Sequence, residues 1–208
     1  LYEIGDESLP VDHPMSKQVR LMRKVDQRSP AKYVMPEIQL ADGVKPDATK
    51  EARQAKRLDQ LAEFLPKGDS VRGEKLFNDP AKSLCITCHV KGDKGVDFGP
   101  DLTRIGAIRT ERDLLEAIVY PSSTIARYYE LVTVETKQGQ AAGLLRRDSV
   151  GEMVLGPAPG AEQAIHFKEI KKAKYSNLSL MPEVFDHLLK PEEIADVVAY
   201  LKEAKEPV

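Results

Sequence analysis

The chain has 208 residues, a formal net charge of −2, 41% hydrophobic and 31% charged residues. These values are ordinary for a globular protein, and no apolar run reaches the roughly 18 residues expected of a membrane-spanning helix. Two cysteines three positions apart exclude a framework of structural disulfides. Because residue 1 is Leu rather than Met, we expect a processed form or a piece of a longer polypeptide.

The first third of the chain predicts an extension with one or two helices. The segment Met15–Met22 has apolar residues at helical spacing, and three prolines then interrupt the pattern. A second helix is expected over 47–65, with Pro66 ending it. Its apolar stripe is mostly alanine, so it buries little area by itself. We therefore expect residues 1–66 to form an extension or linker and residues 67–208 to form the main domain.

Helices are expected on both sides of the cysteine pair. Asp69 or Ser70 can cap a helix over 71–77. Within it Gly73 and Phe77 share a face, a pattern that lets another helix cross closely. Further along, Thr110-Glu111-Arg112-Asp113 is a capping box that begins a helix, and Pro121 ends it.

The end of the chain predicts one more helix. Pro191 suits its first turn. Its apolar residues recur at i, i+3, i+4 and i+7 and form one stripe, made of Ile194, Val197, Val198 and Leu201.

The segment from about 128 to 175 has a different period. Apolar and polar residues alternate after Tyr129, and short apolar runs follow at 143–145, 153–155 and 165–167, separated by Gly, Asp and Pro. We expect about five strands in a small antiparallel sheet. The periodicity therefore predicts a mainly helical fold with a small antiparallel β insertion, plus a helical N-terminal extension.

The motif that carries chemistry is Cys85-Ile86-Thr87-Cys88-His89. It matches the C-x-x-C-H pattern of covalent haem attachment. Two thiols at this spacing can add to the two vinyl groups of one porphyrin, and the adjacent imidazole of His89 can bind the iron. The sequence therefore predicts one haem c, with Cys85 and Cys88 as its thioether positions.

Two other uses of a cysteine pair are less well supported. A redox dithiol needs a thioredoxin-like βαβ context, which does not surround this motif. A structural zinc site needs two more ligands at suitable spacing, and the chain has no second cysteine pair.

Together, these segments resemble a class I c-type cytochrome. The resemblance implies a mainly α cytochrome c fold with a small antiparallel β insertion, plus a helical N-terminal extension. More narrowly, they resemble the haem-binding c-type domain found fused to larger proteins in planctomycetes and verrucomicrobia. The resemblance covers about 71–204 and rests on the haem motif, Gly99-Pro100-Asp101-Leu102-Thr103, Leu114-Leu115-Glu116, Tyr129-Glu130 and Ser179-Leu180-Met181-Pro182.

The resemblance implies two further site residues. Pro100 stands where such proteins place the backbone carbonyl that accepts the N–H of the iron-bound imidazole. Met181 stands where they place the second iron ligand, which would make His89 and Met181 the metal ligands and raise the reduction potential. The alternatives are a simple Gly-Pro turn at Pro100 and a Met181 that only packs against the haem edge. His187 is the next candidate ligand, followed by Met153 and His166.

The function expected is one-electron transfer between a fused or docked redox partner and a respiratory acceptor, rather than catalysis. The alternative is a haem enzyme or gas sensor with an open or displaceable distal site. A third hypothesis is an interaction module in which the β segment binds a partner and the haem is partly structural. The purpose of the β segment itself stays open between covering a haem edge, binding a partner protein and forming a homodimer contact. No nucleic-acid-binding module is recognisable. Because thioether attachment takes place outside the cytoplasm, we expect a periplasmic or otherwise exported protein.

Overall fold

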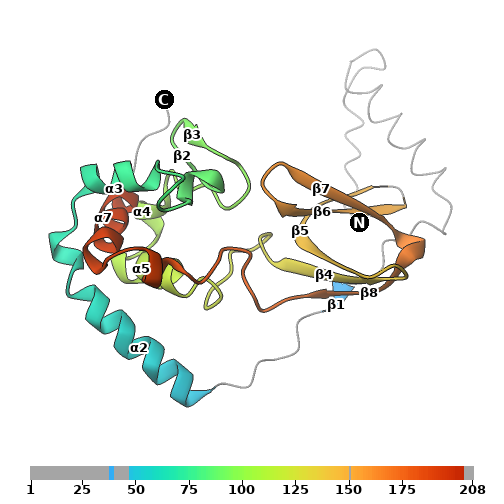
Figure 1. Ribbon diagram of the computed structural model, residues 1–208, viewed down its shortest axis with the longest axis horizontal. Helices are drawn as coiled ribbons and strands as arrows, with labels where there is room; N and C mark the ends of the chain where they lie inside the picture. The colour runs from blue at the N-terminus through green and yellow to red at the C-terminus, as the bar shows by residue number, and fades with distance from the viewer. Residues whose placement is uncertain (1–37, 40–46, 150, 204–208) are drawn as a thin grey trace, which may run out of the picture.

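A computed structural model of the chain describes residues 38–39, 47–149 and 151–203. The expected helix around Met15–Met22 lies outside these residues. Figure 1 shows an elongated arrangement with a helical unit at one end and a β-sheet at the other. The chain enters the helical unit through α2, passes into the sheet after α5, and returns for α6 and α7.

The helical unit contains six described α-helices. Their bounds are α2 (Ala48–Ala62), α3 (Ser70–Phe77), α4 (Ile105–Ile108), α5 (Glu111–Val119), α6 (Phe185–Leu188) and α7 (Pro191–Lys202). Short 3₁₀ helices span Leu65–Lys67 and Cys85–Thr87, and a two-stranded hairpin pairs β2 (Val90–Lys91) with β3 (Lys94–Gly95).

Local signals in the sequence explain where these helices begin. Asp69 is the N-cap of α3, and its carboxylate accepts the backbone N–H of Arg72 at 2.8 Å. The expected capping box of Thr110 and Asp113 is present at α5, and Pro191 occupies the first turn of α7. Helix α2 ends at Ala62, just before the 3₁₀ helix that contains Pro66.

The crossing of α3 and α7 is the central contact of the helical unit. A Cβ on Gly73 would overlap the backbone carbonyl of Asp196 and lie 2.9 Å from the Cβ of Tyr200. Beside it, the rings of Phe77 and Tyr200 pack with centroids 5.5 Å apart. Gly73 therefore acts as expected, because it lets α7 approach α3 closely. The Phe77 ring packs against α7 beside this contact.

Ion pairs connect the helices around this crossing. Arg72 of α3 donates to both carboxylate oxygens of the buried Asp196 of α7 at 2.7 Å, across 124 positions of sequence. Asp196 also accepts the backbone N–H of Asp69 at 2.7 Å. Arg57 of α2 similarly contacts both carboxylate oxygens of Asp186 of α6. Because Asp196 is buried, removing its partner would leave an uncompensated charge in the interior.

Helix α2 contributes to the same core. Its buried residues are Leu58 and Leu61, which belong to one hydrophobic cluster with Phe77, Leu115 and Val197. The predicted apolar stripe of this helix is buried only in its C-terminal half, where Leu58, Ala62 and Leu65 contact the core, whereas its first three alanines are exposed.

The sheet has six strands in the order β1-β8-β4-β5-β6-β7. Their bounds are β1 (Ile38–Gln39), β4 (Leu131–Thr136), β5 (Gln140–Ser149), β6 (Glu152–Ala158), β7 (Ala161–His166) and β8 (Ile170–Tyr175). Neighbouring strands from β8 to β7 in this order pair antiparallel, whereas β1 is a short edge strand parallel to β8. A 3₁₀ helix, Phe167–Glu169, separates β7 from β8.

The expected mainly α fold with a small β insertion is wrong. Of the described residues, 39% are helical and 25% lie in strands, and five of the six strands of the large sheet pair antiparallel, so the class is mixed α/β. The sheet has a hydrophobic cluster of its own, made of Val132, Val134, Met153, Leu155, Ile165 and Ala173. The alternating pattern indicated strands correctly. It did not show that they would bury a second core.

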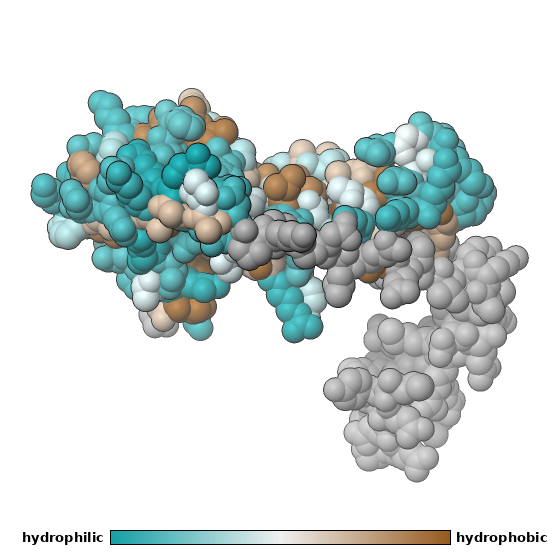
Figure 2. Space-filling model, turned by 90° about the horizontal axis from the view of Figure 1, so that it is seen from below, coloured by the Kyte–Doolittle hydropathy of each residue, from teal (hydrophilic) through white to brown (hydrophobic). Residues whose placement is uncertain are grey.

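One face of the molecule shows how polar and apolar residues are distributed over the two units. On the face drawn in Figure 2, hydrophilic residues cover most of the visible surface at both ends of the molecule. Among the described residues, no helix combines the length and the apolar character that crossing a membrane requires.

The α3–α7 crossing generates a stability prediction. In an exposed helix, Gly→Ala stabilises by about 1 kcal/mol. At Gly73 we expect the opposite sign, a loss of about 1–3 kcal/mol in the free energy of unfolding, because the added methyl group overlaps α7. Urea denaturation measures the change. Val71→Ala on the exposed side of α3 is the control, and a Gly73→Ala variant at least as stable as wild type would contradict the crossing.

Candidate functional site

The cysteine motif forms a tight turn directly after α3. Leu84 has a left-handed backbone (φ 61°), a conformation that a branched side chain rarely adopts, and its carbonyl accepts the backbone N–H of Thr87. The backbone N–H groups of Cys88 and His89 donate to the carbonyl of Cys85 at 3.2 and 3.0 Å. The turn therefore brings both cysteines and His89 into one short segment between α3 and β2.

The hairpin after the motif is fastened to α7. Lys91 of β2 is 2% exposed, donates to the backbone carbonyl of Glu203 at 2.8 Å, and lies 4.8 Å from the centroid of the Tyr200 ring. This buried cation completes the carbonyl end of α7. The motif is thus held against both helices of the central crossing.

His89 makes the hydrogen bond expected of it. Its Nδ1 lies 2.8 Å from the carbonyl oxygen of Pro100. As a donor to a carbonyl, Nδ1 carries the proton, and Nε2 of the neutral ring keeps its lone pair. This tautomer is the one in which an imidazole can bind a metal through Nε2.

Burial favours the same neutral form. It lowers the pKa of the His89 imidazole below its usual value, and the hydrogen bond to Pro100 opposes that shift only in part. Burial also raises the pKa of the Cys85 thiol above its usual value. Both groups are therefore held uncharged, as an apolar environment requires.

Gly99 makes the approach of His89 possible. A Cβ on Gly99 would lie 2.6 Å from Cε1 and 2.9 Å from Nδ1 of the imidazole ring. Any other side chain at this position would push the ring away from the Pro100 carbonyl. In the sequence, Gly99 stands out only as part of the family resemblance, whereas in the structure it packs directly against the His89 ring.

A cavity of about 230 Å³ brings most of the predicted site residues together. Cys85, His89, Pro100 and Met181 all line it, whereas Cys88 does not. A single water needs about 10–15 Å³ by the same kind of measure, so this space is much larger than a packing defect. The rest of its wall is mostly apolar and includes Phe77, Leu102, Leu114, Ile118, Val197 and Leu201.

Met181 reaches the cavity from an irregular segment before α6. Its backbone N–H donates to the hydroxyl of Ser179 at 3.1 Å, and the N–H of Ser179 donates to the hydroxyl of Ser122 at 3.1 Å. The side chain packs against the core of the helical unit. Two serines therefore fasten this segment to the loop after α5, a role that sequence analysis did not identify.

The other candidate iron ligands lie elsewhere. His166 ends β7 and is exposed, and His187 is exposed on α6. Met153 is fully buried in the core of the sheet. Because none of the three lines the cavity, none is placed to act opposite His89.

The alternative uses of the cysteine pair find little support in this geometry. Within the described residues, no three His, Cys, Asp or Glu side chains gather into a group able to hold a metal ion. A single imidazole opposite a single thioether would not form such a group. The motif lies between a helix and a two-stranded hairpin, which is not the βαβ setting of a redox dithiol.

The lining of the cavity is compatible with an apolar group that carries one metal centre. Its wall is mostly apolar, although Arg109, Asp113 and Glu116 also contribute. The Cys85 thiol, a thioether and an imidazole in the tautomer that can bind a metal all line it. These features fit a haem, because the porphyrin needs apolar contact and the iron takes nitrogen or soft sulfur ligands.

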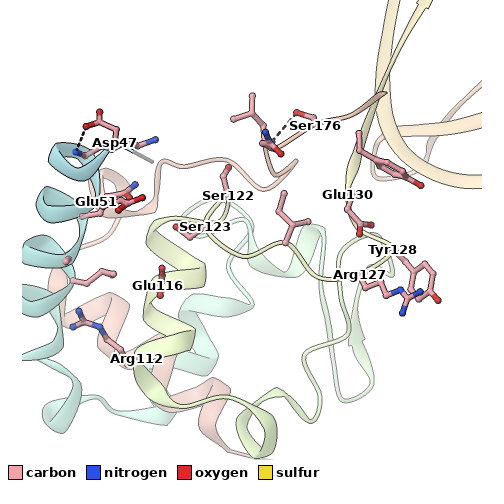
Figure 3. A pocket seen from close by; sticks show the side chains of 18 residues that line it. Asp47, Glu51, Arg112, Glu116, Ser122, Ser123, Arg127, Tyr128, Glu130 and Ser176 are labelled. Atoms are coloured by element: carbon pink, nitrogen blue, oxygen red, sulfur yellow. Dashed lines mark hydrogen bonds between the residues drawn. The ribbon is translucent and has the colours of Figure 1, made fainter. Parts of the chain in front are cut away.

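A larger cavity of about 1260 Å³ lies beside this site. Figure 3 shows Asp47 and Glu51 of α2, Arg112 and Glu116 of α5, and Arg127, Tyr128 and Glu130 of the segment leading to the sheet around it. Neither cysteine nor His89 contributes to its wall. Its charged groups are of both signs and do not converge on one point, so it provides no recognisable chemistry.

The comparisons with known proteins add no relatives. No protein-family model matches the chain, and no curated protein matches it at a significant level.

The contact between Gly99 and His89 generates a second prediction. Gly99→Ala should displace the imidazole or the loop and weaken the bond to Pro100, with a loss of about 1–3 kcal/mol in the free energy of unfolding. Urea denaturation measures the loss, and nitrogen NMR of the His89 ring reports the bond. Pro100→Ala is the control, since it keeps the accepting carbonyl and should leave the ring signals close to wild type. If Gly99→Ala leaves both stability and ring signals unchanged, the packing role of Gly99 is refuted.

Proposed function

We propose that this protein is a monohaem c-type electron-transfer protein. Cys85 and Cys88 would hold the haem through thioethers, and His89 and Met181 would bind its iron. One observation carries the proposal: His89 and Met181 stand on opposite sides of the sheet segment in sequence, yet they line the same apolar cavity together with Cys85.

The surrounding residues support these roles. Pro100 holds the His89 ring in the tautomer that leaves Nε2 available, and this outer bond raises the basicity of the ligand. Ser179 and Ser122 fasten the segment that carries Met181. Most of the remaining wall, which comes from α3, α5, α7 and the loops beside them, is apolar.

The bound haem would supply a one-electron centre whose iron alternates between the ferric and ferrous states. With a thioether opposite the imidazole, both axial positions are occupied, which favours electron transfer over catalysis. A peroxidase would need a distal acid–base group, and neither His166 nor His187 lines the cavity. We therefore propose a carrier rather than an enzyme.

The partner and the location follow from the same chemistry. We propose that the protein relays single electrons from a fused or docked redox partner, such as a dehydrogenase domain, to a respiratory acceptor. Because thioethers form outside the cytoplasm, we place it in the periplasm or another exported compartment. The likeness to the planctomycete and verrucomicrobial haem-binding domain belongs to this proposal as well.

Covalent attachment is tested by replacing the thiols. We expect Cys85→Ala with Cys88→Ala to abolish haem that survives denaturing electrophoresis, because no thioether can form. Haem staining of the gel measures this. Thr87→Ser is the control, since it keeps both thiols and the hydroxyl that contacts the Leu84 carbonyl. Haem retained by the double variant, or absent from the wild type expressed with a haem-attachment system, would exclude the proposal.

The second ligand is tested by Met181→Ala. The wild type should be low-spin and should not bind CO when reduced, whereas the variant should become high-spin and bind CO readily. Absorption spectra of both redox states measure this, and His187→Ala should behave like wild type because His187 is exposed on α6. An unchanged spectrum in Met181→Ala would remove Met181 as a ligand. A wild type that binds CO at once would point instead to a sensor or enzyme.

A further inference from the structure

Arg146 is a side chain of the sheet that contacts the loop next to His89. It belongs to β5, and its Nη2 donates to the backbone carbonyl of Phe98 at 3.1 Å. Its guanidinium carbon also lies 4.6 Å from the centroid of the Phe98 ring. In Figure 1, the loop after β3 extends from the helical unit toward β5–β7, where this contact is made.

The strand is irregular at this residue. Leu145 pairs with Leu155 and Arg147 pairs with Val154, so Arg146 is the extra residue of a β-bulge. A bulge breaks the alternation of side chains and can turn one of them toward a site next to the sheet. In this case it allows Arg146 to reach out of the sheet toward Phe98.

The neighbouring strand leaves space for the same side chain. A Cβ on Gly156 of β6 would lie 2.9 Å from Nε and 3.1 Å from Cγ of Arg146. Two independent backbone features, a bulge in β5 and a glycine in β6, therefore accommodate one arginine. This is more than a chance surface contact would require.

Phe98 transmits the contact to the candidate haem site. Its side chain is 6% exposed, and its N–H donates to the carbonyl of Cys88 at 3.2 Å. The N–H of Gly99 donates to the same carbonyl at 2.6 Å. The next residue is Pro100, whose carbonyl accepts Nδ1–H of His89. The loop 98–100 is thus held by the cysteine motif on one side and by Arg146 on the other.

We propose that Arg146 is a positioning residue for His89. It fixes the loop that carries the Pro100 carbonyl, so the sheet determines how firmly the imidazole is oriented and how strongly its N–H is hydrogen-bonded. This inference rests on the proposed haem function. It also gives the sheet a role in the site, because the sheet would restrain the loop 98–100 next to His89.

The test compares two arginines of the same strand in the holoprotein. Arg146→Gln removes the contact with Phe98. Arg147→Gln removes the same charge from the adjacent position, where Arg147 pairs with Glu162 at 2.8–2.9 Å. The main measurement is hydrogen exchange of the His89 Nδ1–H by NMR in the reduced state, relative to exchange of the Leu115 amide in the helical core. The reduction potential is measured alongside.

In Arg146→Gln we expect exchange of the His89 proton to become about tenfold faster relative to the Leu115 amide, the change that loss of one restraining hydrogen bond would produce. The potential should shift from that of Arg147→Gln, which controls for the charge. Arg146→Lys should restore part of the protection because it can still donate to the carbonyl. Gly156→Ala keeps the charge but displaces the side chain, so it should also speed exchange and serves if Arg146→Gln does not fold.

The outcomes separate the two proposals. If the wild type carries no covalent haem, the proposed function itself fails. If haem is attached but relative exchange and potential in Arg146→Gln equal those of Arg147→Gln, Arg146 does not position His89. A variant that loses only stability in urea, with the His89 proton as protected as before, would show a purely structural contact and overturn the inference.

Discussion

The close crossing of α3 and α7 is the constraint on which the candidate site depends. Gly73 allows the backbone of α7 to approach, and the Phe77–Tyr200 contact fills the space beside it. The cysteine motif directly follows α3, whereas Met181 precedes α7 by a short segment. Joining these two helices therefore brings both halves of the site to one core, although the whole sheet lies between them in sequence.

The sheet is a second structural unit that is coupled to the first. Closing a long loop adds little entropy cost beyond that of a shorter one, so a large segment between α5 and α6 is compatible with the α3–α7 contact. The sheet buries a cluster of its own around Val132 and Leu155. Arg146 of the sheet contacts the loop 98–100. It is the bulged residue of β5, and its side chain packs over Gly156 of β6. This arrangement gives a physical reason for an irregular strand at that position.

The immediate surroundings of His89 show how a neutral imidazole is held ready for a metal. The absence of a side chain at Gly99 lets the imidazole ring pack closely against the loop, and the Pro100 carbonyl accepts a hydrogen bond from its Nδ1–H. Burial disfavours the charged form of the ring. The cavity that contains these groups is smaller than the one between α2, α5 and the sheet connection. Its chemistry, rather than its size, identifies it as the site, because an apolar wall here surrounds a few polar groups of fixed orientation.

The sequence by itself determined the features that depend on neighbouring residues. The caps at Asp69 and Thr110, the first turn at Pro191 and the strands after Tyr129 all followed from patterns a few residues long. The haem attachment inferred from Cys85 to His89 rests on a pattern of the same length and stays a prediction. Tertiary structure decided which remote residues meet. The size of the sheet, and with it the mixed α/β class, depended on a second core that no single strand reveals. The shared cavity of His89 and Met181, the contact of Gly99 with the imidazole and the reach of Arg146 arise where segments far apart in sequence pack together, and local propensity carries no information about such packing.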